Sequence, residues 1–590
     1  MNRKGSKKGK QQSATLGGRQ SRDWRIYMLL FSIFGVFILI IIRLYFLQIV
    51  SHEKYELIAD GQYRIFKKLI PDRGDVFLKN YDKRYPLAIN RDLDTVYVVP
   101  REIDSPEEVV EKVSRVLELD KEKVREKISD KEDVFEILKK KVSEDKVREI
   151  KNFDLKGVHF MAESFRYYPA GKLASHIVGF VGSNGEKFVG RYGLEAYWED
   201  SLRGRAGALS QERDAGGRWI SLAERDFQPA QNGTDLILTI EYTVQYEIEK
   251  ILRETVERHD ADSGEVIVME PSTGRILAMA SYPSFDPNEY YNERDMSVFI
   301  NPIVSQAYES GSVFKTITLA AGIDGGVIDS ESTYVDTGII HEAGYEIMNS
   351  DEKAYGEQTM SQVLEKSLNT GVIHIEKLLG NKRFLGYVKR FGFGEKSGVD
   401  LPGEAGGNIV NLNYINRDIQ FFTASFGQGI TTTPLQLANA YAAIANGGKL
   451  MKPQIVEKRI DSDGNEEEVT PREIRRVIRE DTAEKVSRML RSVIVSGHGK
   501  AADVPGYLVG GKTGTAQVAK QDAQGYEEGV TIGSFAGFAP VNDPRFVVVV
   551  KVSNPKDVIW AESSAAPTFG KVMSFLLSYY NVEPTENINE

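Results

Sequence analysis

The chain of 590 residues contains no cysteine, which excludes several kinds of chemistry at once. Disulfide bonds, zinc sites built on thiolates, iron–sulfur clusters and cysteine nucleophiles all require that residue. Histidine is scarce as well: there are seven, and none stands in an H-x-x-x-H or H-E-x-x-H arrangement. We therefore predict no metal centre and no cofactor.

A surplus of basic residues is also absent. Lysine and arginine number 75 against 85 aspartate and glutamate residues, which gives a formal net charge of −10. Nucleic-acid-binding proteins normally carry the opposite balance, so nucleic acid is not an expected partner. Hydrophobic residues make up 41% and charged residues 27% of the chain, a globular profile. The length predicts roughly four domains of about 150 residues.

Long apolar runs are absent except for one near the N-terminus. Residues 26–42 carry no charge, and after Arg43 the run continues to residue 50. A helix over 26–50 would be about 37 Å long, enough to cross a hydrocarbon core of about 30 Å. Residues 1–25 hold eight basic residues and one acid, so the positive-inside rule predicts a cytoplasmic N-terminus and an extracytoplasmic remainder. No A-x-A-like cleavage site follows, and we expect an uncleaved signal-anchor in the cell membrane.

The composition changes again beyond this run. Residues 101–155 place apolar residues at helical spacing among dense mixed charge, which predicts short amphipathic helices. From about 157 to 230, glycine, tyrosine and β-branched residues predict strands and turns. The next expected elements are a strand at 234–240, a helix at 241–259 and a strand pair at 265–271 and 275–281.

Together these changes divide the chain into five parts. The expected parts are a basic cytoplasmic tail (1–25), a transmembrane helix (26–50), an extracytoplasmic N-terminal module (51–230), a second large domain (231–580) and a polar tail (581–590). Sheet and helix alternate through the second domain without a linker-like break, so we expect it to be a single domain.

The strongest chemical signal is the pair Ser312 and Lys315 in the segment YESGSVFK, residues 308–315. At positions i and i+3 of a helix, two side chains share one face. A serine nucleophile needs an adjacent base, and a lysine can serve when burial or a second cation lowers its pKa. Gly311 is expected to permit the tight turn that places Ser312 at a helix N-terminus. The S-x-x-K pattern alone is a weak signal, because it recurs four more times in the chain.

Two further motifs follow in chain order. Ser367 and Asn369 form S-x-N inside the helix-like segment 362–379, and the only K-T-G of the chain stands at 512–514, after an apolar strand start. The order S-x-x-K, S-x-N, K-T-G is the signature of the penicillin-binding protein and serine β-lactamase superfamily.

The chain resembles, more closely, the class B penicillin-binding proteins, the membrane-anchored transpeptidases of bacterial cell-wall synthesis. The segments RLYFLQI, DRGDVFLKN, FRYYPAGKLASHIVGFVG and GLEAYWEDSLRGRAG are similar to that family's N-terminal module, and GEVIVMEPSTGRILAMASYPSFDPN and FGQGITTTPLQLANAYAAIANGG to its catalytic domain. The resemblance runs from about residue 40 to 580. It implies a multidomain α+β and α/β fold: one N-terminal transmembrane helix, an elongated mixed α+β dimerisation or pedestal module, and a transpeptidase domain with an antiparallel sheet flanked by helices.

The resemblance also implies catalytic roles. Ser312 would attack the carbonyl of a terminal D-Ala-D-Ala bond and become acylated, with Lys315 as the general base. Ser367 would relay a proton to the leaving D-Ala, and Asn369 would orient Lys315 and the substrate peptide.

The K-T-G segment would hold the other end of the substrate. Lys512, Thr513 and Thr515 would bind its terminal carboxylate, and the charge of Lys512 would help to keep the base neutral. The backbone N–H groups of Ser312 and Thr515 would form the oxyanion hole. Gly514 would let the substrate backbone approach the strand.

Three positions depart from the family pattern. Ser310 stands where the family usually has proline, which is expected to loosen the turn without removing a catalytic group. The middle residue of S-x-N is Leu368, which is apolar and expected to face inward. A common Gly-Thr-Gly reads Gly497-His498-Gly499 here, and we interpret this single loop histidine as structural.

Three functions fit these residues. The preferred one is a D,D-transpeptidase that cross-links peptidoglycan stem peptides and is a target of β-lactams. A D,D-carboxypeptidase or β-lactamase would use water as the acceptor, but an uncleaved anchor suits wall synthesis better than it suits a secreted defence enzyme. The third is a β-lactam sensor or a division scaffold without catalysis. A sensor would carry several spans and a zinc protease segment, and the intact motifs argue against an inactive scaffold.

The resemblance finally implies partners. We find no glycosyltransferase segment before the catalytic domain, so a separate polytopic glycan polymerase is expected to dock on residues 26–230, with other division proteins. The chain ends soon after AAPTFGKVMSFLL without appended repeats. Together with the intact Asn369, this ending favours the division-type branch of the family over the elongation type.

Overall fold

The computed structural model describes residues 20–46, 64–183, 188–212, 226–342, 344–520 and 525–585. Most of the expected tail 1–25 therefore lies outside the described residues, as do residues 47–50 of the expected span and 586–590 of the polar tail. The chain divides into two compact units, which are Met1–Ile70 with Ala206–Ala230, and Pro71–Arg205 with Gln231–Glu590.

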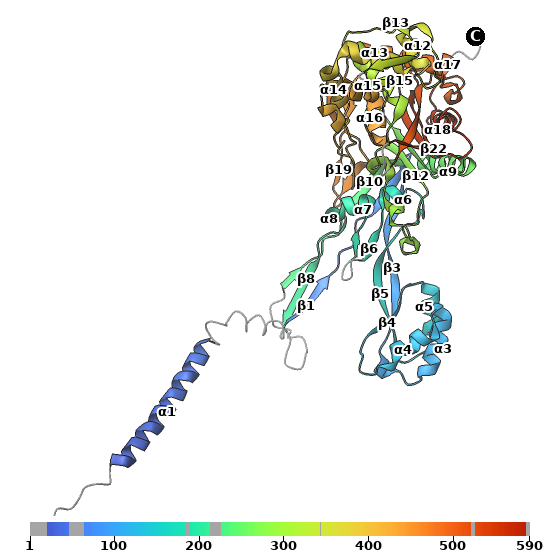
Figure 1. Ribbon diagram of the computed structural model, residues 1–590. Helices are drawn as coiled ribbons and strands as arrows, with labels where there is room; N and C mark the ends of the chain where they lie inside the picture. The colour runs from blue at the N-terminus through green and yellow to red at the C-terminus, as the bar shows by residue number, and fades with distance from the viewer. Residues whose placement is uncertain are drawn as a thin grey trace, which may run out of the picture. The chain divides into compact units, whose positions relative to one another are not determined.

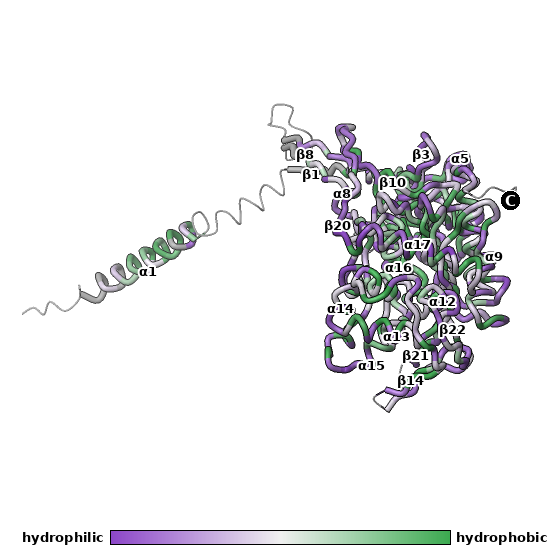
Figure 2. Tube along the Cα trace, turned by 90° about the horizontal axis from the view of Figure 1, so that it is seen from above, coloured by the Kyte–Doolittle hydropathy of each residue, from purple (hydrophilic) through white to green (hydrophobic). Residues whose placement is uncertain are grey.

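The first unit contains the apolar helix α1 (Gln20–Tyr45). Its segment Tyr27–Tyr45 is the single stretch of the described residues that is long and apolar enough to cross a membrane. Figure 2 shows the hydrophobic colour along most of the helix. The same unit has a three-stranded antiparallel sheet in the order β1-β8-β9, with strands β1 (Arg64–Leu69), β8 (Gly207–Glu212) and β9 (Asp226–Gln228).

The second unit begins with the N-terminal module. Its elements are β2 (Val76–Asn80), β3 (Lys83–Val98), η2 (Pro100–Glu102), α3 (Pro106–Leu117), α4 (Lys121–Ser129), β4 (Glu136–Val142), α5 (Glu144–Lys151), β5 (Val158–Tyr167), α6 (Ser175–Val178), β6 (Val181–Ser183), β7 (Phe188–Gly190), α7 (Gly193–Tyr197) and α8 (Glu199–Leu202).

The amphipathic helices expected over 101–155 are confirmed as α3, α4 and α5, which gather at one end of the β3–β5 ladder (Figure 1). Helix α3 buries Val109, Val113 and Leu117 on its inner face. The strand β4 was not expected, because its sequence EILKKKV is mostly charged. It forms because it pairs with β3, which supplies the backbone partners that its side chains do not indicate.

A buried carboxylate joins three of the motifs that carry the family resemblance. Glu195 in GLEAY accepts hydrogen bonds from Arg73 Nε in DRGD (2.6 Å) and from Arg166 Nε in FRYYPAG (2.6 Å). Burial opposes its ionisation, but the two guanidinium groups outweigh it and lower the pKa of Glu195. These three distant segments are therefore held together by one ion-pair network.

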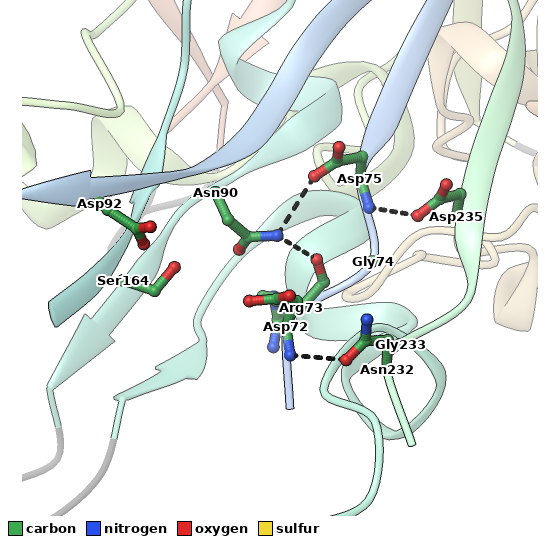
Figure 3. Close-up of a pocket in the computed structure, with 10 residues that line it drawn as sticks. All are labelled: Asp72, Arg73, Gly74, Asp75, Asn90, Asp92, Ser164, Asn232, Gly233 and Asp235. Carbon is green, nitrogen blue, oxygen red and sulfur yellow. Dashed lines mark hydrogen bonds between the residues drawn. The ribbon is translucent and has the colours of Figure 1, made fainter. Parts of the chain in front are cut away.

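The N-terminal module meets the second domain at a small acidic cavity. The cavity measures about 370 Å³ and is lined by Asp72, Arg73, Gly74, Asp75, Asn90, Asp92, Ser164, Asn232, Gly233 and Asp235 (Figure 3). The Asp75 N–H donates to Asp235 Oδ1 (2.7 Å), and the Asp72 N–H donates to Asn232 Oδ1 (3.0 Å). These bonds join residues 72–75, where the chain enters the module, to residues 232–235, where it leaves. The cavity therefore lies where the module connects to the second domain.

One sheet of the second unit combines distant parts of the chain. Its path is β19-β18-β10-β2-β3-β4, with β5 paired to β3, and it includes β10 (Asp235–Glu241), β18 (Val456–Ile460) and β19 (Glu466–Glu468). Strand β10 runs parallel to β2 and antiparallel to β18. The N-terminal module and the second domain thus share backbone hydrogen bonds.

The remaining elements belong to the second domain. The helices are α9 (Tyr242–Arg258), η3 (Tyr290–Asn292), η4 (Met296–Phe299), α10 (Pro302–Ser305), η5 (Gly311–Phe314), α11 (Lys315–Asp324), α12 (Met360–Glu365), α13 (Asn369–Leu379), α14 (Asn381–Arg390), η6 (Val410–Asn413), α15 (Asp418–Ser425), α16 (Pro434–Ala445), α17 (Glu480–Ser496), η7 (Lys500–Ala502) and α18 (Ala565–Tyr579). The strands are β11 (Ser263–Met269), β12 (Ile276–Tyr282), β13 (Thr333–Asp336), β14 (Ile339–Glu342), β15 (Tyr345–Met348), β16 (Gly356–Thr359), β17 (Lys449–Met451), β20 (Glu473–Arg476), β21 (Gly510–Ala519), β22 (Tyr526–Ala539) and β23 (Phe546–Ser553).

The core of this domain is a five-stranded antiparallel sheet in the order β12-β11-β23-β22-β21. Side chains of β23 alternate between its faces: Val548 and Val550 pack in the core with α9 and α18, and Val547 and Val549 in the core with α11 and α16. The expected antiparallel sheet with helices on both faces is therefore confirmed. Strand β21, which carries the K-T-G motif, lies at the edge of the sheet.

Candidate active site

The turn that carries Ser312 is a short 3-10 helix, η5, which continues into α11 from Lys315 onward. Gly311 has a φ of +59°, so the tight turn expected there is confirmed. Ser310 has a φ of −78°, close to the value that proline imposes, so its side chain leaves the backbone shape of the turn unchanged. The Ser312 side chain is half-buried, and its hydroxyl makes no hydrogen bond with any residue that the structure describes.

Two contacts fix this turn in place. The Gly311 N–H donates to the Gly427 carbonyl (3.2 Å), and a Cβ on Gly427 would lie 2.3 Å from the carbonyl oxygen of Gly311. Tyr308 hydrogen-bonds through its hydroxyl to Ser534 Oγ on β22 (2.9 Å). The serine is therefore presented by a turn braced against both a glycine loop and the central sheet.

Lys315 is completely buried, and its side chain connects the first motif to the second. Its Nζ donates to the carbonyl oxygen of Ser367 and to the Ser367 hydroxyl (3.2 Å). Burial, and secondly the charge of Lys512, hold the pKa of Lys315 well below its ordinary value. A neutral amine in this position can accept a proton, which a solvated lysine cannot do at neutral pH.

The expectation that Ser367 lies inside one continuous helix is wrong. Helix α12 ends at Glu365, α13 begins at Asn369, and Ser367 stands between them with a φ of +58°. The Leu368 N–H donates to the Val363 carbonyl (2.9 Å), which closes the end of α12. This left-handed backbone usually belongs to glycine and costs of order 1 kcal/mol for serine. It turns both oxygens of Ser367 toward Lys315. Leu368 is buried, as expected.

Asn369 is the first residue of α13 and faces the β14–β15 hairpin. Its side-chain Nδ2 donates to the Met348 carbonyl (2.7 Å), and its backbone N–H donates to Asn349 Oδ1 (2.9 Å). Among the described residues no hydrogen bond joins Asn369 to Lys315. The hydrogen bond to Met348 therefore fixes the Asn369 amide at the wall of the site, and the S-x-N motif alone did not predict this contact.

The K-T-G segment lies on β21 and completes the site. Lys512 is fully buried, and its Nζ donates to the carbonyl of Thr513 (2.9 Å) and to Thr513 Oγ1 (3.3 Å). Burial lowers the pKa of Lys512 to about 7, against the opposing effect of Glu562. Thr515 Oγ1 accepts a hydrogen bond from the Ala561 N–H (3.1 Å). All three motifs thus meet around two buried lysines, and none of their residues lines the acidic cavity of Figure 3.

Two family models match this arrangement along the chain. The penicillin binding protein transpeptidase domain matches residues 264–574, and the penicillin-binding protein dimerisation domain matches residues 68–238. The chain belongs to the penicillin-binding protein transpeptidase family. The first match contains all three motifs, and the second contains the Glu195 network of the N-terminal module.

Relatives in this penicillin-binding protein family match over nearly the full length. Stage V sporulation protein D of Bacillus subtilis is 36% identical over 95% of this chain and 86% of its own. The peptidoglycan D,D-transpeptidase FtsI of Escherichia coli is 29% identical over 95% of this chain and 93% of its own. A crystal structure of penicillin binding protein 3 from Mycobacterium tuberculosis with aztreonam superposes with a TM-score of 0.68 at 25% identity, over 88% of this chain and 99% of that one.

Several residues that support this candidate site could not be predicted from the three motifs. Beneath Tyr308 lies a buried ion pair between Lys551 Nζ and Glu265 Oε2 (3.1 Å), and the Lys551 Nζ stands 5.1 Å from the centre of the Tyr308 ring. Glu309 accepts hydrogen bonds from the Gly429 N–H (2.9 Å) and the Tyr526 hydroxyl (3.1 Å). Of the residues that support the turn at 308–315, only the glycines of FGQG could have been found from the sequence, by their spacing. The other supporting residues are single residues of common types.

Gly514 is tightly packed against the turn that carries Ser312. A Cβ at this position would lie 2.8 Å from the Ser310 carbonyl oxygen and 3.0 Å from the Val313 backbone nitrogen. The glycine therefore allows β21 to approach the turn that carries Ser312, in addition to any role toward substrate. We expect Gly514→Ala to push strand and turn apart and to slow acylation by a β-lactam about 10²–10³-fold, the typical effect of misplacing one oxyanion donor. Stopped-flow acylation measures this.

The matched control for this prediction is Gly386→Ala. Gly386 lies in α14, and no atom would stand within 4 Å of an added Cβ there. Alanine favours a helix by about 1 kcal/mol over glycine, so this variant should acylate at the wild-type rate with unchanged or higher thermal stability. A Gly514→Ala chain that acylates as fast as Gly386→Ala would show that the close approach is unimportant.

Proposed function

We propose that the chain is a peptidoglycan D,D-transpeptidase that forms an acyl-enzyme on Ser312. One observation carries this proposal: Lys315 is buried beside Lys512 and hydrogen-bonded to Ser367, so its pKa is far below the ordinary value. A lysine placed three residues after a serine at the start of a helix is thereby converted into a base. The names of the relatives support the same activity, since one is a peptidoglycan D,D-transpeptidase.

The proposed reaction has two acyl transfers. Ser312 Oγ attacks the carbonyl of the penultimate D-Ala while Lys315 takes the hydroxyl proton, and the oxyanion is held by the N–H groups of Ser312 and Thr515. The C–N bond then breaks, and the terminal D-Ala leaves with a proton relayed through Ser367. An amine of a second stem peptide attacks the ester, gives up a proton and releases Ser312, which forms the cross-link.

Recognition of the donor peptide is proposed to use the other wall. Lys512, Thr513 and Thr515 bind the terminal carboxylate, and Gly514 keeps the strand close to the reacting turn. Asn369, fixed on the β15 carbonyl, donates to or accepts from the peptide backbone of the stem. A β-lactam enters the same site and acylates Ser312 because its strained amide takes the place of the D-Ala-D-Ala bond.

We also propose where the protein acts. Helix α1 anchors it in the cell membrane as a single span with a cytoplasmic N-terminus, and the parts 51–230 and 231–580 lie outside. The partners proposed are stem peptides, a polytopic glycan polymerase and other division proteins. A septal role is favoured by the intact Asn369 of the S-x-N motif, whereas the name of the Bacillus relative refers to sporulation. Localising a fluorescent fusion during vegetative growth separates the two.

Mass spectrometry of the full-length chain in detergent tests the activity. After incubation with benzylpenicillin we expect one adduct of the drug mass, mapped to the peptide that contains Ser312 and stable for hours. A synthetic stem peptide ending in D-Ala-D-Ala, offered with an amine acceptor, should yield the cross-linked product. Rapid release of hydrolysed drug and peptide would instead establish a carboxypeptidase or β-lactamase.

A further inference from the structure

A histidine–glutamate pair stands beside the K-T-G strand and has no part in the steps above. His498 Nδ1 lies 2.7 Å from Glu562 Oε1, which is an ion pair when the imidazole is protonated. His498 lies in the turn between α17 and η7, and Glu562 lies in the segment between β23 and α18. The contact therefore joins two segments whose residues are 64 positions apart in sequence, and the histidine stands in the segment Gly497-His498-Gly499.

The backbones on both sides of this pair are fixed. A Cβ on Gly497 would lie 2.6 Å from the Glu365 carbonyl oxygen, and a Cβ on Gly499 would lie 2.7 Å from Ile494 Cδ1, so the turn is packed on both flanks. On the other side, the Ala561 N–H is bonded to Thr515 Oγ1 (3.1 Å). A surface ion pair usually contributes little because two long side chains must be ordered to form it. Here the backbone segments that carry His498 and Glu562 are already fixed, which reduces the cost of ordering this pair.

The charge of Glu562 acts on the buried lysine of the K-T-G motif. Burial lowers the pKa of Lys512, and Glu562 is the group that opposes this change. In return, the hydrogen bond from His498 and the charge of Lys512 lower the pKa of Glu562, although its partial burial acts the other way. Two further groups take part in the described structure: His498 from the α17–η7 turn acts on Glu562, and Lys315 from α11 has its pKa lowered by burial and by the charge of Lys512.

We propose that His498 and Glu562 are positioning residues for Lys512: His498 holds the Glu562 carboxylate beside β21, where its negative charge keeps Lys512 protonated and able to bind an anionic substrate group. This inference rests on the proposed function, in which Lys512 binds the donor carboxylate.

The His498–Glu562 pair explains how the two lysines of the site can have different protonation states. Lys315 has to be neutral to act as a base, whereas Lys512 has to be charged although it is equally buried. A carboxylate on the Lys512 side stabilises the charge of that lysine, and the charged Lys512 then disfavours protonation of Lys315. One half-exposed glutamate thus supports both protonation states.

The pH dependence of acylation by benzylpenicillin tests this in the full-length protein. Glu562→Gln keeps an acceptor for His498 and removes only the charge. With the Lys512 pKa at about 7, a fall of that pKa by about one should slow acylation about tenfold at pH 8 and less than about twofold at pH 6. Glu102→Gln is the matched control: His159 and Glu102 form a similar half-exposed pair at 2.8 Å in the N-terminal module, and its profile should coincide with wild type.

Substitutions of the histidine separate orientation from charge. His498→Ala leaves the carboxylate unfixed and should slow acylation about threefold at pH 8, because a mobile, solvated charge acts more weakly on Lys512. His498→Gln restores an N–H donor and should recover most of the wild-type rate. Equal loss at every pH in Glu562→Gln, or a profile that coincides with wild type, would overturn the proposal.

A direct titration separates failure of this inference from failure of the proposed function. In protein labelled with ¹³C at lysine Cε, the Lys512 signal is assigned by its absence from Lys512→Arg, and its pKa should fall in Glu562→Gln. This readout does not need an acyl-enzyme. A wild-type protein that forms no adduct refutes the proposed function, whereas a Lys512 pKa that is unchanged in Glu562→Gln refutes the positioning role alone.

Discussion

Ser312→Ala should abolish the covalent penicillin adduct while leaving the protein folded. The substitution removes one oxygen that accepts and donates no hydrogen bond among the described residues, so the free energy of unfolding should change by less than about 0.5 kcal/mol. The acylation rate should fall by at least about 10⁴-fold, because no other group can form the ester. Intact-protein mass spectrometry measures the adduct, and thermal unfolding in detergent measures the stability.

A neighbouring serine supplies the control. Ser310 stands two residues earlier on the same turn, and its hydroxyl is buried without a hydrogen-bond partner in the described structure. Ser310→Ala should therefore acylate at close to the wild-type rate. An adduct that persists in Ser312→Ala would show that the nucleophile is a different residue, and a loss of adduct in both variants would point to damage of the turn.

Much of the fold follows from local pattern. The strand pair at 265–281 and the helix after 241 are confirmed as β11, β12 and α9, because alternation and helical spacing reflect which face is buried. Strand β4 escaped prediction because its partner β3, and not its own side chains, determines its conformation. The break between α12 and α13 escaped as well, since a residue with a positive φ at Ser367 has no signal in an otherwise apolar, helix-like segment.

The candidate site divides in the same way. The order of three short motifs predicted which residues gather, because each motif keeps its residues at fixed spacing on one element. The residues that support them are single and distant in sequence: Gly427 against the Ser312 turn, Ser534 beside Tyr308 and Glu562 near Lys512. Only the tertiary fold brings such residues to the site, and none belongs to a type that is rare enough to stand out.

Lys315→Met should slow acylation by about 10²–10⁴-fold, the usual contribution of a general base. Burial and the charge of Lys512 lower the pKa of Lys315, so the neutral amine is the active form. The wild-type rate should accordingly fall as the pH drops through that lowered pKa, and the variant should lose this acid limb. Lys315→Arg keeps a charge that cannot be removed and should be as slow as Lys315→Met. An arginine variant within tenfold of wild type would exclude the role of base.

The same substitution should stabilise the protein, and the sign follows from the lowered pKa of Lys315. Folded Lys315 binds a proton less readily than the unfolded chain, whose lysine has the ordinary pKa of 10.5. Wild-type stability is therefore lost toward low pH and regained as the pH rises toward 10.5. A pKa difference of one between the folded and unfolded chain corresponds to about 1.4 kcal/mol of stability. Lys315→Met should therefore gain more than about 1 kcal/mol at pH 6 and less at pH 9, after the loss of its bonds to Ser367.

Another buried lysine, Lys551, serves as the control, because we expect its replacement by methionine to destabilise the protein. Lys551 is paired with Glu265, and both side chains are almost inaccessible to solvent. Lys551→Met would leave the carboxylate buried without its partner, which should cost about 3–5 kcal/mol. Two buried lysines in one domain should then respond to the same substitution with opposite signs, because one lies near a cation and the other near a carboxylate. Chemical unfolding of both variants at pH 6 and pH 9 measures the difference, and destabilisation of Lys315→Met at pH 6 would contradict a neutral Lys315.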